Sequence, residues 1–316
     1  MNAIAAIFVN KSEKRLRAGW RILIHLIAVI AFGIGGGFVA SQVPDGPVSE
    51  VVDSLVYLVV VLFATWLVGR FIDRRRFAAF GFHLSAGWWA DLMFGLVLGA
   101  ALMSGIVAVM LNLGWATLSQ DSATDLNVPI AAAFAIQLWA LIVVGINEEV
   151  VFRGYQLRNM SEGFSRFGKP LAIFIAIVIS SAIFGLGHLG NESEAAGGAH
   201  TTSLAMLNLI LAGGVMLAVP YLLTGELAIP IGIHITWNLF QGPVFGLAVS
   251  GLESNTRLLT VTPTGPEMWT GGDYGAEGGL LVTIAVFVSI ALSALWVGFR
   301  KRQVALQTDI ATYTPR

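Results

Sequence analysis

Long stretches without a charged residue recur along the whole chain, and they limit what it can fold into. A membrane-spanning helix needs about 20 mostly apolar residues in a row, and the sequence contains eight stretches of that kind. They cover residues 20–40, 52–69, 89–113, 129–148, 170–188, 204–223, 227–250 and 278–299. Charged residues make up only 12% of the chain, whereas soluble domains carry roughly a quarter. The pattern predicts an all-α integral membrane protein, a bundle of about eight transmembrane helices.

The Lys and Arg residues predict the orientation of this bundle, because cytoplasmic loops are enriched in them. If the N-terminus is cytoplasmic, eight crossings return the C-terminus to the cytoplasm, and Arg257 alone falls outside. The basic residues on the inside are then Lys11, Lys14, Arg15, Arg17, Arg21, Arg70, Arg74–Arg76, Arg153, Arg158, Arg166, Lys169, Arg300–Arg302 and Arg316. The outside loops instead carry Asp45, Asp121, Asp125, Glu192, Glu194, Glu267 and Asp273. Short loops and a basic inner face fit a multi-pass protein of a bacterial plasma membrane.

The remaining segments give fewer signals. The basic stretch Lys11–Arg21 leads into a run long enough to span, so we expect no cleavable signal peptide. Phe77–Trp89 is aromatic with few charges, which predicts an interfacial helix or a re-entrant stretch. The loop 251–277 is expected to be exposed and to take no part in chemistry. Glycines such as Gly95–Gly99 and Gly213–Gly214 are expected to let helices pack closely.

Three short polar motifs interrupt the apolar runs, where each ionisable group is costly unless it is paired or hydrated. They read N-E-E-V-V-F-R-G at residues 147–154, F-G-L-G-H at residues 184–188 and H-I-T-W-N at residues 234–238. Their occurrence on three separate spans favours a functional site over isolated packing residues. The other three histidines, which lie near helix ends or in loops, are expected to be structural: His25, His83 and His200.

Helical spacing predicts how these polar groups are arranged. Glu149 and Arg153 are four residues apart, so they share a face and can form an ion pair. Glu148 is rotated by about 100° from Glu149 and is left free to act on water. His234 and Asn238 are also four apart and can present two polar groups at one point.

These residue types suit the activation of water. A carboxylate in a low-dielectric site gains affinity for protons, and a neighbouring histidine can share the proton. A second histidine and an amide can donate hydrogen bonds to the oxyanion of a tetrahedral intermediate. The same set can instead hold a divalent metal with an open water position, with Glu148, His188 and His234 as ligands. Spacing alone does not separate the two mechanisms, and the chain has no cysteine for thiolate chemistry.

The three motifs resemble those of the CPBP family of membrane proteins. E-E-V-V-F-R, F-G-L-G-H and H-I-T-W-N are similar to the family patterns EExxxR, FxxxH and HxxxN, and the resemblance covers about residues 128–245. The family includes type II CAAX prenyl proteases and bacteriocin-processing, Abi-like proteins. The resemblance implies an intramembrane endopeptidase that cleaves a peptide or membrane-protein substrate. It implies that Glu148 is the general base, assisted by His188. His234 and Asn238 then form the oxyanion hole, and Glu149 with Arg153 orients the site.

The resemblance also suggests how the chain is divided and leaves the cofactor open. Helices 1–3 with the interfacial segment occupy residues 1–127, the catalytic core residues 128–250, and the external loop, last helix and cytoplasmic tail residues 251–316. The expected partners are the substrate and the lipid bilayer, and no nucleic acid is expected. The cofactor is either none or a divalent metal, and a metal-free glutamate mechanism is preferred.

Two other functions remain open from the sequence. Buried Glu and His side chains also form the proton relays of transporters, and a non-enzymatic scaffold or regulator could keep the same fold. The motifs HExxH, G-x-S-G and G-x-G-D are absent, so other classes of intramembrane protease lack support. The position of His188, toward the far end of its span, is a difficulty. To meet Glu148 it requires a tilted or displaced fifth helix, or an interfacial segment at Ser161–Phe167.

Overall fold

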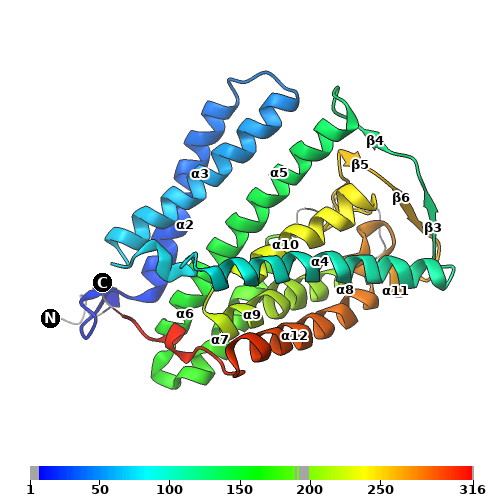
Figure 1. Ribbon diagram of the computed structural model, residues 1–316. Helices are drawn as coiled ribbons and strands as arrows, with labels where there is room; N and C mark the ends of the chain where they lie inside the picture. Colours follow the sequence, from blue (N-terminus) through cyan, green and yellow to red (C-terminus); the bar gives the residue numbers. More distant parts are fainter. Residues whose placement is uncertain (1–6, 189–190, 192–198, 315–316) are drawn as a thin grey trace.

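The computed structural model describes residues 7–188, 191 and 199–314, most of which are helical (Figure 1). The α-helices are α2 (Ala18–Ala40), α3 (Pro47–Phe71), α4 (Ala86–Asn112), α5 (Ile130–Glu149), α6 (Arg158–Gly163), α7 (Lys169–Leu186), α8 (Ala199–Leu209), α9 (Leu217–Thr224), α10 (Ala228–Leu239), α11 (Glu267–Thr270) and α12 (Leu280–Lys301). Three π-helical segments are η2 (Val150–Leu157), η5 (Ile210–Met216) and η6 (Phe240–Val244). Five 3₁₀ turns are η1 (Phe77–Phe80), η3 (Ser165–Phe167), η7 (Gly272–Tyr274), η8 (Ala276–Gly278) and η9 (Thr308–Ala311). Glu192, Glu194, Arg316 and the side chain of His200 lie outside the described residues.

Seven helices among the described residues are long and apolar enough to cross a membrane, which confirms an all-α membrane bundle. They include one continuous helix, Ile130–Gly163, formed by α5, η2 and α6. The stretch predicted as a seventh span, residues 227–250, differs from the expectation. It forms the shorter α10–η6 helix, which ends at Val244 because Pro243 lacks an N–H and Gly246 turns the chain with φ +69°.

Helix α10 occupies the centre of the bundle, and all of its residues except Asn238 are buried. It packs along α4 through glycines on both helices. A Cβ atom on Gly232 would lie 2.6 Å from the backbone oxygen of Leu92 and from the backbone nitrogen of Leu96. The small residues predicted to permit close packing therefore do so here. This contact fixes the helix that carries His234 and Asn238.

One end of the bundle gathers most of the basic residues, and we call it the basic end. It comprises residues 7–17, 72–85, 164–168, 225–227 and 302–314 with the adjoining helix ends. Glu162 of α6 bridges Arg15, Arg21 and Arg75 there, and Arg15 also pairs with Asp73 at 3.3 Å. The guanidinium of Arg15 lies 3.5 Å from the ring centroid of Tyr313, so the first and last described segments meet (Figure 1). The seven long helices and the shorter α10–η6 helix together bring both described ends of the chain to the same side of the bundle.

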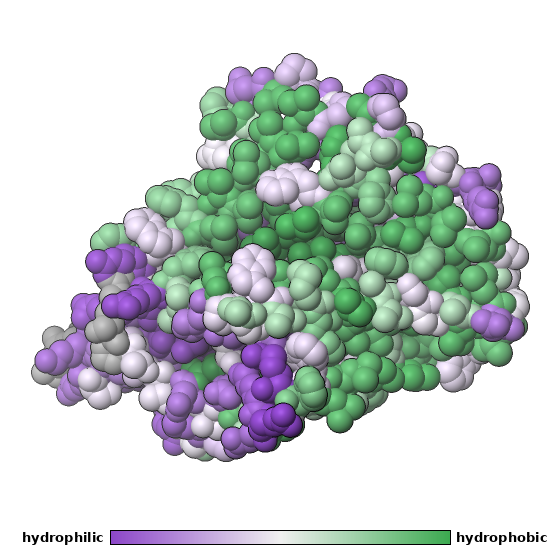
Figure 2. All heavy atoms as spheres, in the orientation of Figure 1, coloured by the Kyte–Doolittle hydropathy of each residue, from purple (hydrophilic) through white to green (hydrophobic). Residues whose placement is uncertain are grey.

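The opposite end, which we call the loop end, is built from residues 41–46, 113–129, 187–188, 191, 199 and 245–279. Two antiparallel pairings join the longer loops, β3 (Ala116–Ser119) with β6 (Thr260–Pro263) and β4 (Ala123–Thr124) with β5 (Thr256–Arg257). A third pairing, β1 (Val9–Asn10) with β2 (Arg15–Leu16), forms a hairpin at the basic end. In the view of Figure 2, hydrophobic side chains cover the body of the bundle and hydrophilic ones gather most densely around the basic end.

Two expectations for connecting segments are wrong. Phe77–Trp89 does not form a separate helix: Phe77–Phe80 form the 3₁₀ turn η1, and α4 already begins at Ala86. Whether the segment is interfacial or re-entrant stays a prediction. Its Phe80 is fully buried, because the ring packs on Gly69 of α3. The loop 251–277 is not simply exposed either, since Tyr274 and Glu277 are buried and the loop contributes to the cavity described below.

Candidate active site

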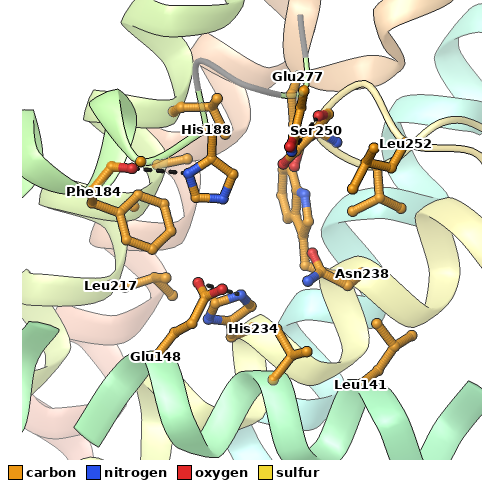
Figure 3. Close-up of a pocket in the computed structure, with 18 of the residues that line it drawn as sticks. Leu141, Glu148, Phe184, His188, Leu217, His234, Asn238, Ser250, Leu252 and Glu277 are labelled. Atoms are coloured by element: carbon orange, nitrogen blue, oxygen red, sulfur yellow. Dashed lines mark hydrogen bonds and ion pairs between the residues drawn. The ribbon is translucent and has the colours of Figure 1, made fainter. Parts of the chain in front are cut away.

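A cavity of about 520 Å³ lies between the helices, and all three polar motifs contribute to its wall. Glu148, His188, His234 and Asn238 line it, and Figure 3 shows their side chains around the same space. Much of the remaining wall is apolar and comes from α3, α5, α7, η5 and α9. The structure therefore brings together residues that lie up to 90 positions apart in the sequence.

The two adjacent glutamates have different environments. The side chain of Glu149 is fully buried, whereas that of Glu148 is 22% exposed and faces the cavity. Oε1 of Glu149 accepts a hydrogen bond of 2.6 Å from Nη1 of Arg153. Oε2 of Glu148 has no hydrogen-bond partner among the described residues. One carboxylate is thus neutralised behind the site, while the other is left available within it.

Arg153 acts as a fixed counter-ion and does not line the cavity. Its guanidinium carbon lies 4.8 Å from the ring centroid of Phe184, which in turn meets Phe152 nearly edge-on. A buried cation is tolerated only when it is paired, and Glu149 supplies that pairing. The expected i,i+4 ion pair is present, and the aromatic ring of the second motif helps to hold it.

The imidazole of His234 lies between the two glutamates. Its Nδ1 is 2.8 Å from Oε1 of Glu149, and its Nε2 is 3.7 Å from Oε2 of Glu148. Glu149 is already paired with Arg153 and can only accept, so Nδ1 of His234 must be the donor. The second separation is too long for a direct hydrogen bond but suits one bridging water or substrate oxygen.

His188 and Asn238 complete the polar lining from the other sides. Nδ1 of His188 lies 2.8 Å from the carbonyl oxygen of Phe184 and therefore donates to it. In the neutral form this leaves Nε2 as an acceptor, and Figure 3 shows the ring facing the cavity above Glu148 and His234. Asn238 is half-buried one turn beyond His234 and lines the cavity.

The difficulty over His188 is removed by the length of the helix that carries Glu148. That helix does not end at residue 148 but continues through η2 and α6 to Gly163. Glu148 lies 15 residues before Gly163, and His188 lies 19 residues after Lys169, which begins α7 at the same end. At 1.5 Å per residue the two differ by only about 6 Å in depth. The orientation predicted from the sequence places Arg153 and Arg158 in a cytoplasmic loop after the span. In the structure Arg153 is buried and Arg158 is nearly buried inside the bundle.

Comparison with known families identifies the segment that carries the motifs. Residues 129–240 match the model of a family described as Rce1-like, type II CAAX prenyl endopeptidase Rce1-like. The chain carries an Rce1-like domain. This match confirms the CPBP resemblance that the three motifs predict, and it assigns residues 129–240 to a family of CAAX-type proteases. No curated protein and no solved structure matches the chain.

The Rce1-like domain does not supply the whole cavity wall, and sequence reasoning misses the residues that complete it. Glu277 lies outside the domain and lines the cavity, with Oε2 accepting hydrogen bonds from the backbone N–H of Ser250 at 2.5 Å and from Nε2 of Gln241 at 3.1 Å. Burial raises the pKa of Glu277. Tyr57 of α3 and the exposed Glu253 also line the cavity. No motif marks these residues, because their place depends on tertiary packing.

Each of the three described π-helical segments borders the cavity of the Rce1-like domain. η2 begins directly after Glu149, and its Phe152 is part of the wall. η5 contributes Ala212, Gly213 and Met216, and η6 contributes Pro243. π-helical turns are rare and occur often at functional sites. Here they shift the side chains of three helices toward a shared space, which hydrophobic periodicity does not reveal.

The side chains proposed as metal ligands do not form a three-ligand site. Among the described residues, no group of three His, Asp or Glu side chains is arranged to hold a metal ion. His234 uses Nδ1 for Glu149 and has only Nε2 to offer, and Nδ1 of His188 is bound to a backbone carbonyl. The described residues of the Rce1-like domain therefore do not fit a metal in this geometry.

Proposed function

We propose that the protein is an intramembrane endopeptidase in which Glu148 activates the water that hydrolyses a peptide bond. The observation that carries the proposal is the contrast between the two glutamates. Glu149 is buried and paired with Arg153, whereas Glu148 faces a cavity that also holds two histidines and an amide, and its Oε2 has no hydrogen-bond partner among the described residues. The Rce1-like match supports a protease of this family.

In the proposed reaction, Glu148 takes one proton from a water molecule, whose oxygen attacks the carbonyl carbon of the scissile peptide bond. The carbonyl oxygen becomes the oxyanion of a tetrahedral intermediate. As the C–N bond breaks, the proton on Glu148 passes to the leaving amine nitrogen, and His188 assists this transfer through Nε2. The products are a carboxylate and an amine, so no other reactant is needed.

The oxyanion is stabilised by the side-chain amide of Asn238 and by Nε2–H of His234. Since Nδ1 of His234 donates to Glu149, Nε2 carries a proton only when the imidazole is cationic. That charge balances the cluster: Arg153 and cationic His234 face the anions Glu148 and Glu149. Glu149 and Arg153 position His234 and take no direct part in bond breaking.

The test is cleavage of peptides by the purified protein in detergent, where both faces of the bundle are accessible. A panel of leader peptides and a farnesylated CAAX peptide would be compared between the wild type and Glu148→Ala. Glu267→Ala, at an exposed position of the 251–277 loop that does not line the cavity, is the control. We expect cleavage by the wild type and the control, loss of at least about a hundredfold in Glu148→Ala, and no effect of a strong chelator.

Other results would overturn parts of this proposal. Loss of cleavage with the chelator and recovery with an added divalent metal would replace the metal-free mechanism. Equal rates for the wild type and Glu148→Ala would remove Glu148 from the base role. If no peptide is cleaved, the non-enzymatic scaffold and the proton-coupled transporter become the better explanations of the same buried Glu and His residues.

A further inference from the structure

The two ends of the bundle differ sharply in basic residues. The chain has 18 Lys and Arg residues, and Arg257 is the only one among the described residues of the loop-end connections, 41–46, 113–129, 187–188, 191, 199 and 245–279. The basic end instead holds runs of them in its connections and at the adjoining helix ends. This asymmetry is the feature by which membrane proteins are oriented, with the Lys- and Arg-rich side in the cytoplasm.

The candidate active-site cavity reaches the loop end and not the basic end. Nine of its lining residues come from the loop-end connections: Gly187, His188, Asn191, Val249, Ser250, Leu252, Glu253, Ser254 and Glu277. Of these, Gly187, Leu252 and Glu253 are exposed. No described residue of the five basic-end connections lines the cavity. Between the cavity and the basic end lie η2, α6 and the buried cluster of Glu162 with Arg15, Arg21 and Arg75.

We propose that the active site is entered from the side of the membrane opposite the cytoplasm, and that its substrates are peptide segments located on that side. This inference rests on the proposed peptidase function for the identity of the ligand, but the direction of entry rests only on the charge asymmetry and the cavity. An exported peptide, or the external part of a membrane protein, meets the loop end directly. A protein prenylated and kept in the cytoplasm would meet the basic end.

The charged residues that line the cavity indicate which charges the substrate carries near the cleaved bond. Glu148, Glu253 and Glu277 line it, and no Lys or Arg of the described residues does. The cation that the proposed mechanism places in this wall, His234, is balanced by Glu148 and Glu149. A free C-terminal carboxylate would therefore meet a predominantly acidic wall, whereas a neutral or basic segment would meet complementary charge. The substrate is therefore cleaved at an internal bond flanked by neutral or basic residues.

The absence of cysteine from the natural sequence gives a direct test of the entry side. Leu252→Cys places one thiol at the cavity rim, and Val304→Cys places one in the basic-end tail; both native side chains are exposed and apolar. Intact spheroplasts of a bacterial expression host would be treated with a membrane-impermeant maleimide, before and after permeabilisation. Glu253→Cys is a second rim position in case Leu252→Cys does not accumulate. The labelling is repeated in a Glu148→Ala background, so that it does not depend on turnover.

We expect the rim cysteine in intact spheroplasts to be labelled at least about tenfold more than the tail cysteine, and the tail cysteine to react only after permeabilisation. Labelling of the tail but not the rim, or equal labelling of both before permeabilisation, would overturn the proposal. A peptide with Lys or Arg beside the scissile bond should slow rim labelling in the Glu148→Ala background, and its Asp- or Glu-flanked counterpart should not. If the labelling is as expected but no peptide is cleaved, the proposed entry side is supported and only the peptidase function is contradicted.

Discussion

The Nδ1 atom of His234 lies 2.8 Å from Oε1 of the fully buried Glu149. This contact joins the first and third motifs across 85 positions of sequence and sets which ring nitrogen faces the cavity. Glu149 also accepts a hydrogen bond from Arg153. Removing the charge of Glu149 would therefore leave both Arg153 and His234 without their anionic partner. Glu149 is therefore expected to act on the reaction through His234 and not through the substrate.

This relationship predicts different outcomes for two neighbouring substitutions. Glu149→Gln should lower the free energy of unfolding by about 3 kcal/mol, because a buried pair is broken and Arg153 stays buried. Glu148→Gln should change stability by less than about 1 kcal/mol while abolishing cleavage, since the Glu148 carboxylate has no cationic side chain paired to it at hydrogen-bond distance. Thermal unfolding in detergent and the peptide assay together measure both effects. Equal loss of stability in the two variants would contradict the division of roles.

A second prediction concerns the contact between α4 and α10. Gly232→Ala should lower the free energy of unfolding by about 1–3 kcal/mol and reduce cleavage, because its Cβ would meet the backbone of α4 at 2.6 Å. The displaced α10 would carry His234 and Asn238 out of register with Glu148. The matched control is Gly105→Ala on the exposed side of α4, where a Cβ meets nothing within 4 Å. That change should be neutral or stabilise the helix by up to about 1 kcal/mol.

If both alanine variants behave alike in thermal unfolding and in cleavage, close packing at Gly232 is not what positions the site. Loss of cleavage in Gly232→Ala without any loss of stability would still support a positioning role, since a misplacement of about 1 Å can lower a rate by about a hundredfold.

Hydrophobic periodicity predicts the helices of this protein well but not their ends near the site. The apolar run that ends at residue 148 continues as helix to Gly163, because Arg153 pairs with Glu149 and Glu162 pairs with three arginines instead of facing water. Charged residues are normally a sign that a span has ended, and buried ion pairs remove that sign. For the same reason the sequence seems to place Glu148 at the cytoplasmic end of its span, far from His188. In the structure the helix continues to Gly163, and Glu148 lies near its middle.

The motif residues can be found from sequence because their spacing along helices carries the information. Glu277 cannot be found in this way, since it lies in a Gly-rich loop and reaches the cavity only through contacts with Ser250 and Gln241. The π-helical segments cannot be predicted from the sequence either. A π-helical turn holds one more residue than an α-helical turn but needs no particular residue type. Local patterns thus predict the chemistry of the site, and tertiary packing decides its outer wall.

A third prediction compares a buried and an exposed ion pair at the basic end. Glu162→Gln should lower the free energy of unfolding by about 3 kcal/mol, because it leaves Arg15, Arg21 and Arg75 without their shared carboxylate. The control is Asp309→Asn, whose side chain is 90% exposed and pairs with Lys169 at 3.1 Å. Its effect should stay below about 0.5 kcal/mol. Thermal unfolding at low and high salt would measure both, and a salt-sensitive loss of equal size in the two variants would contradict burial of the cluster.

The last prediction follows from Glu277, whose pKa is raised above the ordinary value of 4.5 chiefly by burial, although hydrogen bonds from Ser250 and Gln241 act in the opposite direction. Between 4.5 and the higher folded-state pKa, the folded protein holds a proton on Glu277 that the unfolded chain has released. The contribution of this group to stability is therefore complete below 4.5 and is lost as the pH rises through the folded-state pKa.

Glu277→Gln stays uncharged at every pH and should remove this part of the pH dependence. Relative to the variant, the wild type should lose thermal stability steadily as the pH is raised from about 4 to about 8. Glu253→Gln, at an exposed position of the same cavity wall, should leave the slope of the wild type unchanged. Melting temperatures of the three proteins in detergent across this range measure the difference. A wild-type protein that gains stability relative to Glu277→Gln as the pH rises would show that Glu277 is ionised in the fold, stabilised by the Ser250 and Gln241 hydrogen bonds more than it is destabilised by burial.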